Sequence, residues 1–141
     1  MNCYAVIDTN VLVSALLTTH EDAATIQVIV KIIDGTIIPL CSEAIFKEYT
    51  EVLQRRKFHF SKDRIEKLLA IFKVTGIFIS PKRIDYNLPD SKDIPFYEVV
   101  MDKRKTGAYL VTGNLKHFPR QSFIVTPREL LGILRELKLR R

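Results

Sequence analysis

Three acidic residues of this chain stand at positions where a carboxylate can do chemistry. Asp8 directly follows the apolar run 3–7. Glu48 borders the apolar stripe of a predicted helix, and Asp93 follows a loop bounded by prolines. In an open parallel α/β sheet, ligands bind beyond the carboxyl ends of the strands, so an acid at the end of the first strand belongs to such a site. We therefore take these three acids as one candidate site.

Carboxylates that meet in one site imply a cation. Their mutual repulsion raises their pKa values unless a positive charge relieves it. Oxygen ligands without thiolate or imidazole favour Mg²⁺ or Mn²⁺. Such an ion lowers the pKa of a bound water, orients the resulting hydroxide and neutralises charge on a leaving oxygen. The acidic set therefore predicts hydrolysis of a phosphodiester without a covalent intermediate.

Each acid also has a structural explanation. Asp is a favoured N-cap and the helix dipole stabilises an acid there, so Asp93 could simply cap the helix that follows it. Asp8 or one of its neighbours could cap the first helix in the same way, and Glu48 could pair with Arg55 at the surface. The combination of three such positions, rather than any one of them, favours a shared site.

The elements that position these acids alternate between strand and helix. Short apolar segments rich in β-branched and aromatic residues predict strands at 3–7, 36–40, 76–79, 109–112 and 123–125. The intervals predict helices: one or two between 11 and 33, others capped by Ser42 and Ser61, one from 94 to 105, and a last one opened by the capping box Thr126–Glu129. This order implies a single α/β domain over residues 1–141, with a mostly parallel sheet covered on both faces.

Composition excludes several classes of protein. The chain has 141 residues, of which 47% are hydrophobic and 27% charged, as expected for one globular domain. No apolar run approaches the roughly 20 residues of a membrane span, and no signal peptide is recognisable, so we expect a cytoplasmic protein without a membrane partner. The two cysteines and three histidines lack the spacing of a zinc site.

The charge distribution favours an anionic partner. The net charge is +6, and basic residues dominate 116–141 and form two further clusters at 55–57 and 103–105. A basic surface around an acidic centre suits a phosphodiester substrate. The alternative is that these clusters are solvated faces of helices.

Four motifs follow one another along the chain. They are the run 6–15, Ser42 with Glu48 and 52–53, the run 90–93 with Phe96, and the run 109–114. Over nearly the whole chain these motifs resemble PIN-domain nucleases, specifically toxins of prokaryotic toxin–antitoxin pairs. The resemblance implies a three-layer α/β/α sandwich with a short, mostly parallel sheet of about five strands.

The same resemblance implies a function. It indicates an endoribonuclease, a hydrolase dependent on Mg²⁺ or Mn²⁺, in which Asp8, Glu48 and Asp93 are catalytic and bind the metal. The supporting residues that it implies are Thr9, Asn10, Asp90, Thr112 and Asn114. RNA is the expected substrate, and the candidate protein partners are a separately encoded antitoxin and a second copy of the chain.

One position departs from the family pattern. Asn114 stands where many relatives place a further aspartate, and an amide oxygen can ligate a metal but brings no charge. One alternative is therefore a catalytically weak PIN domain that binds RNA or a protein. Another is a phosphotransfer domain of the haloacid-dehalogenase or receiver type, although the sequence after Asp8 lacks the second aspartate of the former.

Overall fold

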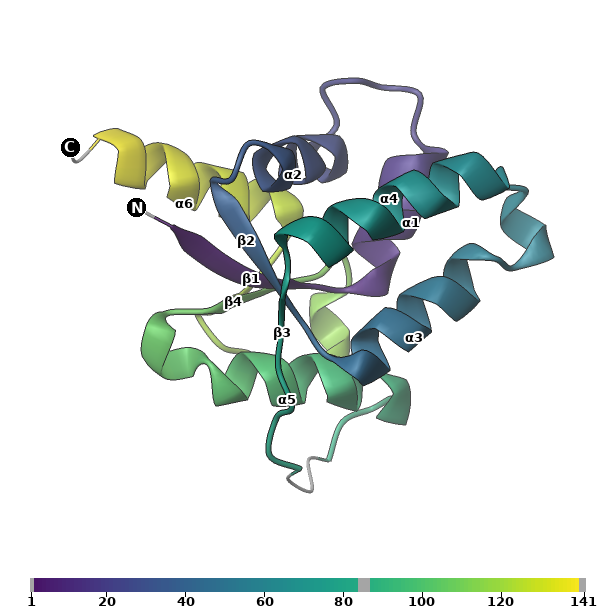
Figure 1. The fold of residues 1–141 in the computed structure, drawn as a ribbon. Coiled ribbons are helices and arrows are strands. Elements are labelled where there is room, and N and C mark those ends of the chain that lie inside the picture. The colour runs from purple at the N-terminus through teal and green to yellow at the C-terminus, as the bar shows by residue number, and fades with distance from the viewer. Residues whose placement is uncertain (1, 84–86, 140–141) are drawn as a thin grey trace.

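A parallel sheet forms the centre of the computed structural model, which describes residues 2–83 and 87–139 (Figure 1). Its strands are β1 (Cys3–Ile7), β2 (Ile37–Cys41), β3 (Ile77–Phe78), β4 (Tyr109–Val111) and β5 (Ile124–Val125). They lie in the order β3-β2-β1-β4-β5, and each neighbouring pair is parallel. The five predicted strands are confirmed, with small shifts at their ends.

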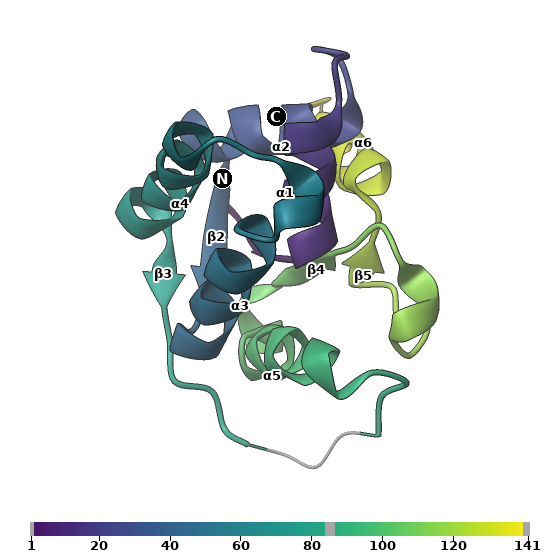
Figure 2. The same ribbon diagram turned by 90° about the vertical axis from the view of Figure 1, so that its right-hand side faces the viewer.

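Helices cover both faces of the sheet. They are α1 (Thr9–Leu17), α2 (Ala24–Ile33), α3 (Glu43–Leu53), α4 (Lys62–Thr75), α5 (Ile94–Asp102) and α6 (Pro127–Leu139). α5 packs across one face, while α1, α2, α4 and α6 lie on the other (Figures 1 and 2). α3 lies at the carboxyl end of the sheet and contacts α1, α4 and α5 (Figure 1). The fold is the three-layer α/β/α sandwich that the sequence predicted.

Local signals fix where several helices begin. The hydroxyls of Ser42 and Ser61 each accept a hydrogen bond of 3.2 Å from the backbone three residues further on. Thr126 and Glu129 exchange hydrogen bonds of 2.9 and 3.2 Å, which is the predicted capping box. The segment predicted as one or two helices forms two, and the helix predicted to reach residue 105 ends at Asp102, followed by a short 3-10 turn at 104–106.

The register of the sheet brings the ends of three strands to one edge. Val6 is paired with Leu40 of β2, and Ile7 with Val111 of β4. The backbone N–H of Asp8 still donates to the carbonyl of Val111 at 2.9 Å. Because β1 is buried between the two helical layers, its first polar residue is delivered from inside the core to the edge where α/β proteins bind ligands.

Parts of two predicted features lie outside the residues that the structure describes. Residues 84–86 of the loop before Asp93, and Arg140 and Arg141 of the basic carboxyl-terminal stretch, lie outside the described residues. None of the helices within the described ranges combines the length and hydrophobicity of a membrane span.

Candidate active site at the carboxyl end of the sheet

Asp8 stands at the junction of β1 and α1, with 5% of its surface exposed. It occupies the N-cap position of α1, but its side chain makes no capping hydrogen bond. Instead, its Oδ2 accepts a hydrogen bond of 2.7 Å from the hydroxyl of Thr112, the residue after β4. Helix capping therefore does not explain this carboxylate, which is held by the residue that follows the neighbouring strand.

Asp93 ends the short 3-10 helix η2 (Ser91–Asp93), directly before α5. It is buried and also occupies an N-cap position without a capping hydrogen bond. Its Oδ2 is enclosed, and within the described residues no backbone group or side chain other than His117 stands close enough to donate to it. Nδ1 of His117 lies 3.1 Å from this oxygen, close enough for an ion pair when the imidazole is protonated. The carboxylate of Asp93 is therefore held by His117 and not by the start of α5, so capping does not explain it either.

Glu48 reaches the same edge from α3. Its Oε2 accepts a hydrogen bond of 3.2 Å from the hydroxyl of Thr9, in the first turn of α1. The next residue, Tyr49, is completely buried and donates from its hydroxyl to the backbone carbonyl of Ile7. These two contacts join α3 to the end of β1 and set the position of Glu48 relative to Asp8.

All three predicted catalytic acids line one pocket of about 310 Å³. Three of the predicted supporting residues line it as well: Thr9, Asn10 and Asp90. The other two flank it, because the backbone N–H of Asn114 donates to the hydroxyl of Thr112 at 3.0 Å and that hydroxyl in turn holds Asp8. The fold therefore brings together residues that are far apart in the sequence.

A larger hollow of about 580 Å³ opens at the opposite edge, where β1 and β2 begin. Its lining includes Leu131 and Leu134 of α6, the cations Lys31 and Arg135, and a single described acid, Asp34. Ligands of parallel α/β sheets bind at the carboxyl ends of strands, and active sites gather perturbed titratable groups. We therefore place the candidate active site in the smaller pocket.

His117 also lines this pocket, although it was not among the residues predicted from the sequence. It ends the 3-10 turn η4 (Leu115–His117), which folds the chain back toward the sheet after Asn114. Nδ2 of Asn114 lies 2.9 Å from Nε2 of His117. Since an amide nitrogen only donates, Nε2 is the acceptor and the ring proton of the neutral imidazole lies on Nδ1, facing Asp93. The sequence signal that could have found His117 is its place three residues after Asn114.

The pocket is electrostatically unfavourable for its own acids. Burial raises the pKa of Asp8 to about 6; the Thr112 hydroxyl lowers it, and the nearby charge of Asp93 raises it further. Burial likewise raises the pKa of Asp93, which His117 opposes and the charges of Asp90 and Glu48 reinforce. Both shifts indicate a site that would gain stability from an added positive charge.

The acids line one pocket, but their side chains do not form a complete metal-binding site. Among residues 2–83 and 87–139, no three acidic, histidine or cysteine side chains stand close enough together to hold an ion by themselves. An ion bound here would therefore need other ligands besides these side chains.

Thr112→Val is expected to raise the pKa of Asp8 above its value of about 6, because the hydroxyl bond that favours the ionised form is lost while the shape of the side chain is kept. An NMR titration of the carboxyl carbon measures this value in metal-free protein. Thr50→Val is the control, since it removes a hydroxyl bond that lies within α3. An unchanged titration in Thr112→Val would show that the bond does not control Asp8.

The sequence model of the PIN-domain family matches residues 4–116. The matched region runs from β1 into η4 and contains the three acids with their supporting residues. Members of this family share a nuclease-type fold and are generally nucleases. The comparison with curated proteins gave no match. The family match covers most of the chain and agrees with the parallel α/β/α architecture, so the chain belongs to the PIN-domain family.

Proposed function

We propose that the protein is a metal-dependent endoribonuclease, which hydrolyses phosphodiester bonds of RNA with water. The observation that supports this most directly is the pocket itself. Carboxylates from the β1–α1 junction, from α3 and from the start of α5 line it together, and two of them are buried at helix N-termini that they do not cap. Such an arrangement destabilises the metal-free protein and is explained by a role in catalysis.

Mg²⁺ or Mn²⁺ suits the donors of this pocket. The lining offers carboxylate, amide and hydroxyl oxygens, and Oδ2 of Asp93 is buried with His117 as its one neighbouring donor in the described residues. Mg²⁺ keeps several waters and binds proteins through one or two carboxylates together with substrate phosphates, so a partly open ligand set fits it. We assign Asp8 and Asp93 to hold the ion and Glu48 to complete its surroundings. When bound, the ion activates water and neutralises charge on the leaving oxygen.

The remaining residues hold these groups in place. The Thr112 hydroxyl orients the carboxylate of Asp8, and the Thr9 hydroxyl orients that of Glu48. Glu48 is thereby positioned to align the attacking water and to accept its proton. His117, oriented by its contact with Asn114, faces Asp93 within the pocket. The expected supporting roles of Asn10 and Asp90 are local, since Asn10 accepts from the Gly113 backbone and Asp90 from that of Lys92.

Removal of the metal is expected to abolish cleavage of single-stranded RNA, and Mn²⁺ or Mg²⁺ should restore it. The same ions should raise the melting temperature of the protein, because binding to the native state alone stabilises it by about 3 kcal/mol at a hundredfold excess over Kd. The measurements are gel assays and thermal melts in EDTA, before and after readdition of the ion, with K⁺ at equal ionic strength as the control. Cleavage that continues in EDTA would refute the metal dependence.

One observation favours a second candidate function. The position of a further acid is occupied by Asn114, whose amide is engaged by His117 and brings no charge. A catalytically weak PIN domain that binds RNA or a protein would have this composition. RNA binding that survives chelation, together with no turnover at high Mn²⁺, would support it over the nuclease.

The biological role is a further part of the proposal. The resemblance of the motifs to toxins of toxin–antitoxin pairs supports a cytoplasmic toxin whose antitoxin inserts a segment near the acidic pocket. A second copy of the chain is the other candidate partner.

A further inference from the structure

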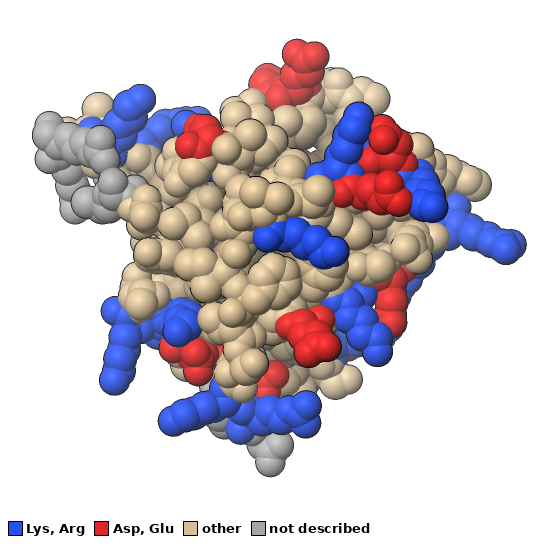
Figure 3. Space-filling model, in the orientation of Figure 1, with Lys and Arg blue, Asp and Glu red and all other residues tan. Residues whose placement is uncertain are grey.

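The connection between α3 and α4 has an unusual composition. Residues 55–60 read Arg-Arg-Lys-Phe-His-Phe, which we call the Arg55–Phe60 segment. It contains the 3-10 helix η1 (Arg56–Phe58), and its cationic side chains are exposed. Basic side chains project from the end of the molecule where this segment lies (Figure 3). The segment therefore presents positive charge and aromatic rings together at the surface.

The two aromatic rings of the segment form a stack. The centroids of Phe58 and Phe60 are 5.3 Å apart and their planes differ by 9°. Phe60 packs against the hydrophobic core, and the guanidinium of Arg64 lies over its ring. Arg64 also donates to the carbonyl of Leu16 at 2.7 Å, which ties this side of the stack to α1. Phe60 thus anchors the stack to the rest of the protein. We call the stacked pair of Phe58 and Phe60 the platform.

Phe58 is the outer ring of this platform, and it borders the acids. Phe58 and Arg55 line the same pocket as Asp8 and Glu48. Nζ of Lys57 lies 5.1 Å from the centroid of Phe58, and this exposed, flexible side chain can leave the ring when a ligand arrives. A stacked base is worth more than an exposed cation–π contact, so the exchange favours a nucleotide.

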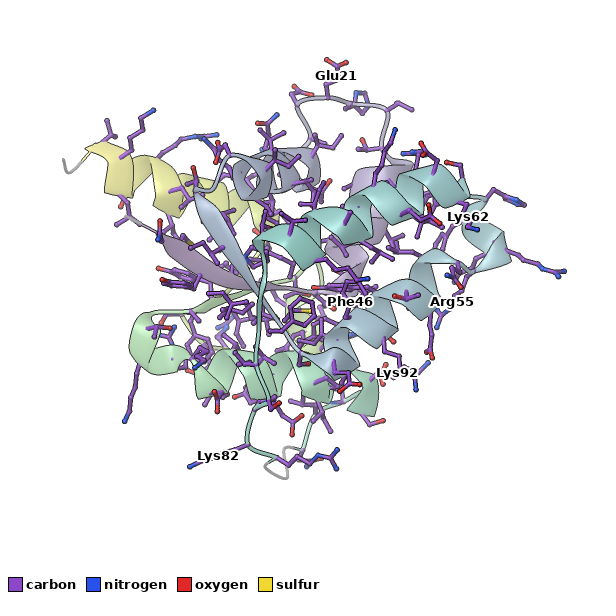
Figure 4. The ribbon with its side chains drawn as sticks, viewed as in Figure 1. Glu21, Phe46, Arg55, Lys62, Lys82 and Lys92 are labelled. Carbon is purple, nitrogen blue, oxygen red and sulfur yellow. The ribbon has the colours of Figure 1, made fainter. Side chains whose placement is uncertain are left out.

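Lys92 completes the positive charge around the pocket. It is exposed on η2 and lines the pocket together with Arg55. Figure 4 shows Arg55 and Lys92 beside α3, and Lys82 apart from them on the chain after β3. The pocket that holds the acids is therefore lined by two cations and an aromatic ring as well.

We propose that the Arg55–Phe60 segment binds single-stranded RNA, with one base stacked on Phe58 and the adjoining phosphates held by Arg55 and Arg56. This inference rests on the proposed function, which it deepens by naming the substrate's form and the surface that selects it. Bases of a duplex already stack on one another and cannot offer a free face to Phe58, whereas those of a single strand can. The platform thereby favours unpaired RNA beside the carboxylates.

The test is equilibrium binding of a short fluorescent RNA in EDTA, free and annealed to its complement. The wild-type protein should prefer the single strand. Phe58→Ala should weaken single-strand binding about tenfold or more with little change for the duplex, and Phe58→Trp should keep the preference. Phe78→Ala, which removes an exposed phenylalanine of β3, is the matched control and should bind as the wild type does.

The cations are tested through salt dependence. The double variant Arg55→Ala/Arg56→Ala should reduce the slope of log affinity against log salt by about 0.7 for each phosphate contact that is lost. Lys82→Ala is the control and should leave the slope unchanged. Melting curves establish that each variant is folded.

The outcomes separate this inference from the proposed function. If Phe58→Ala and Phe58→Trp bind single strands as the wild type does while Mn²⁺-dependent cleavage is present, the platform is wrong and the nuclease stands. If the binding pattern is as expected but no ion supports cleavage, the nuclease is wrong and the RNA-binding surface stands. An equal loss of single-strand and duplex binding in Phe58→Ala would also overturn the platform.

Discussion

Asp8→Asn is expected to reduce Mn²⁺-dependent RNA cleavage about a hundredfold or more. Loss of a group that merely orients a metal ligand costs 10- to 100-fold in activity, so loss of the charged ligand itself should reach at least the upper end of that range. The amide has the shape of the carboxylate and can still accept the bond from Thr112, so the change removes charge and leaves the local packing intact. Initial rates at saturating Mn²⁺ measure the effect.

The same substitution should stabilise the metal-free protein at neutral pH. The pKa of Asp8 rises from 3.8 to about 6 on folding, mainly because the carboxyl is buried. The folded state therefore holds this proton more tightly, so the contribution of Asp8 to stability is present below 3.8 and is lost as the pH rises through about 6. At neutral pH the ionised group costs up to about 3 kcal/mol, which Asp8→Asn removes.

Urea unfolding in EDTA across this pH range distinguishes the variant from the wild type. The wild-type free energy of unfolding should fall between pH 3.8 and about 6, and this fall should be smaller in Asp8→Asn. Asp63→Asn, an exposed acid of α4, is the control and should change neither cleavage nor the slope. Unchanged cleavage by Asp8→Asn, or parallel pH profiles, would contradict the role given to Asp8.

Tyr49→Ala is expected to lower the free energy of unfolding by about 3–5 kcal/mol, as other large-to-small changes of buried aromatic residues do. Tyr49 is completely buried between α3 and the sheet. Its ring lies 5.3 Å from that of Phe72 in an edge-to-face arrangement and 6.1 Å from that of Phe96. Since the free energy of unfolding of a whole domain is about 5–15 kcal/mol, this single change removes a large part of the stability of the protein.

Tyr49→Phe distinguishes the contribution of the hydroxyl to stability from that of the ring. It keeps the aromatic packing but leaves the carbonyl of Ile7 without its partner, so we expect a loss of about 1–3 kcal/mol. Tyr4→Phe, in the half-buried Tyr4 of β1, is the control and should change stability by less than about 0.5 kcal/mol. If Tyr49→Phe were as stable as the wild type, the hydroxyl would not be what fixes α3 to the end of β1.

The elements of the fold follow from local signals in the sequence. Apolar runs such as 3–7 and 109–112 became strands, and Ser42, Ser61 and the Thr126–Glu129 box became helix caps, because burial patterns and capping bonds involve neighbours along the chain. The position of Asp8 at the carboxyl edge of the sheet could be predicted as well, because the strand before it was predicted at 3–7 and the structure confirms these bounds.

Local signals do not predict which side chains line the pocket. The sequence favours capping for Asp93 taken alone, whereas in the fold its carboxyl makes no capping hydrogen bond and faces His117. His117 carries no motif that marks it, and Phe58 reads simply as part of a basic, aromatic connection. These side chains meet because the fold brings together segments that are far apart in the sequence.

The sequence by itself determined the alternation of strands and helices, the parallel sheet, the family and the acids worth testing. The tertiary structure alone decided that β1 and β4 end side by side, so that Thr112 holds Asp8, and that α3 brings Glu48, Arg55 and Phe58 to the same pocket. The physical reason is range: secondary structure is set by contacts between near neighbours, whereas a site is set by the strand register and crossovers that join distant ones.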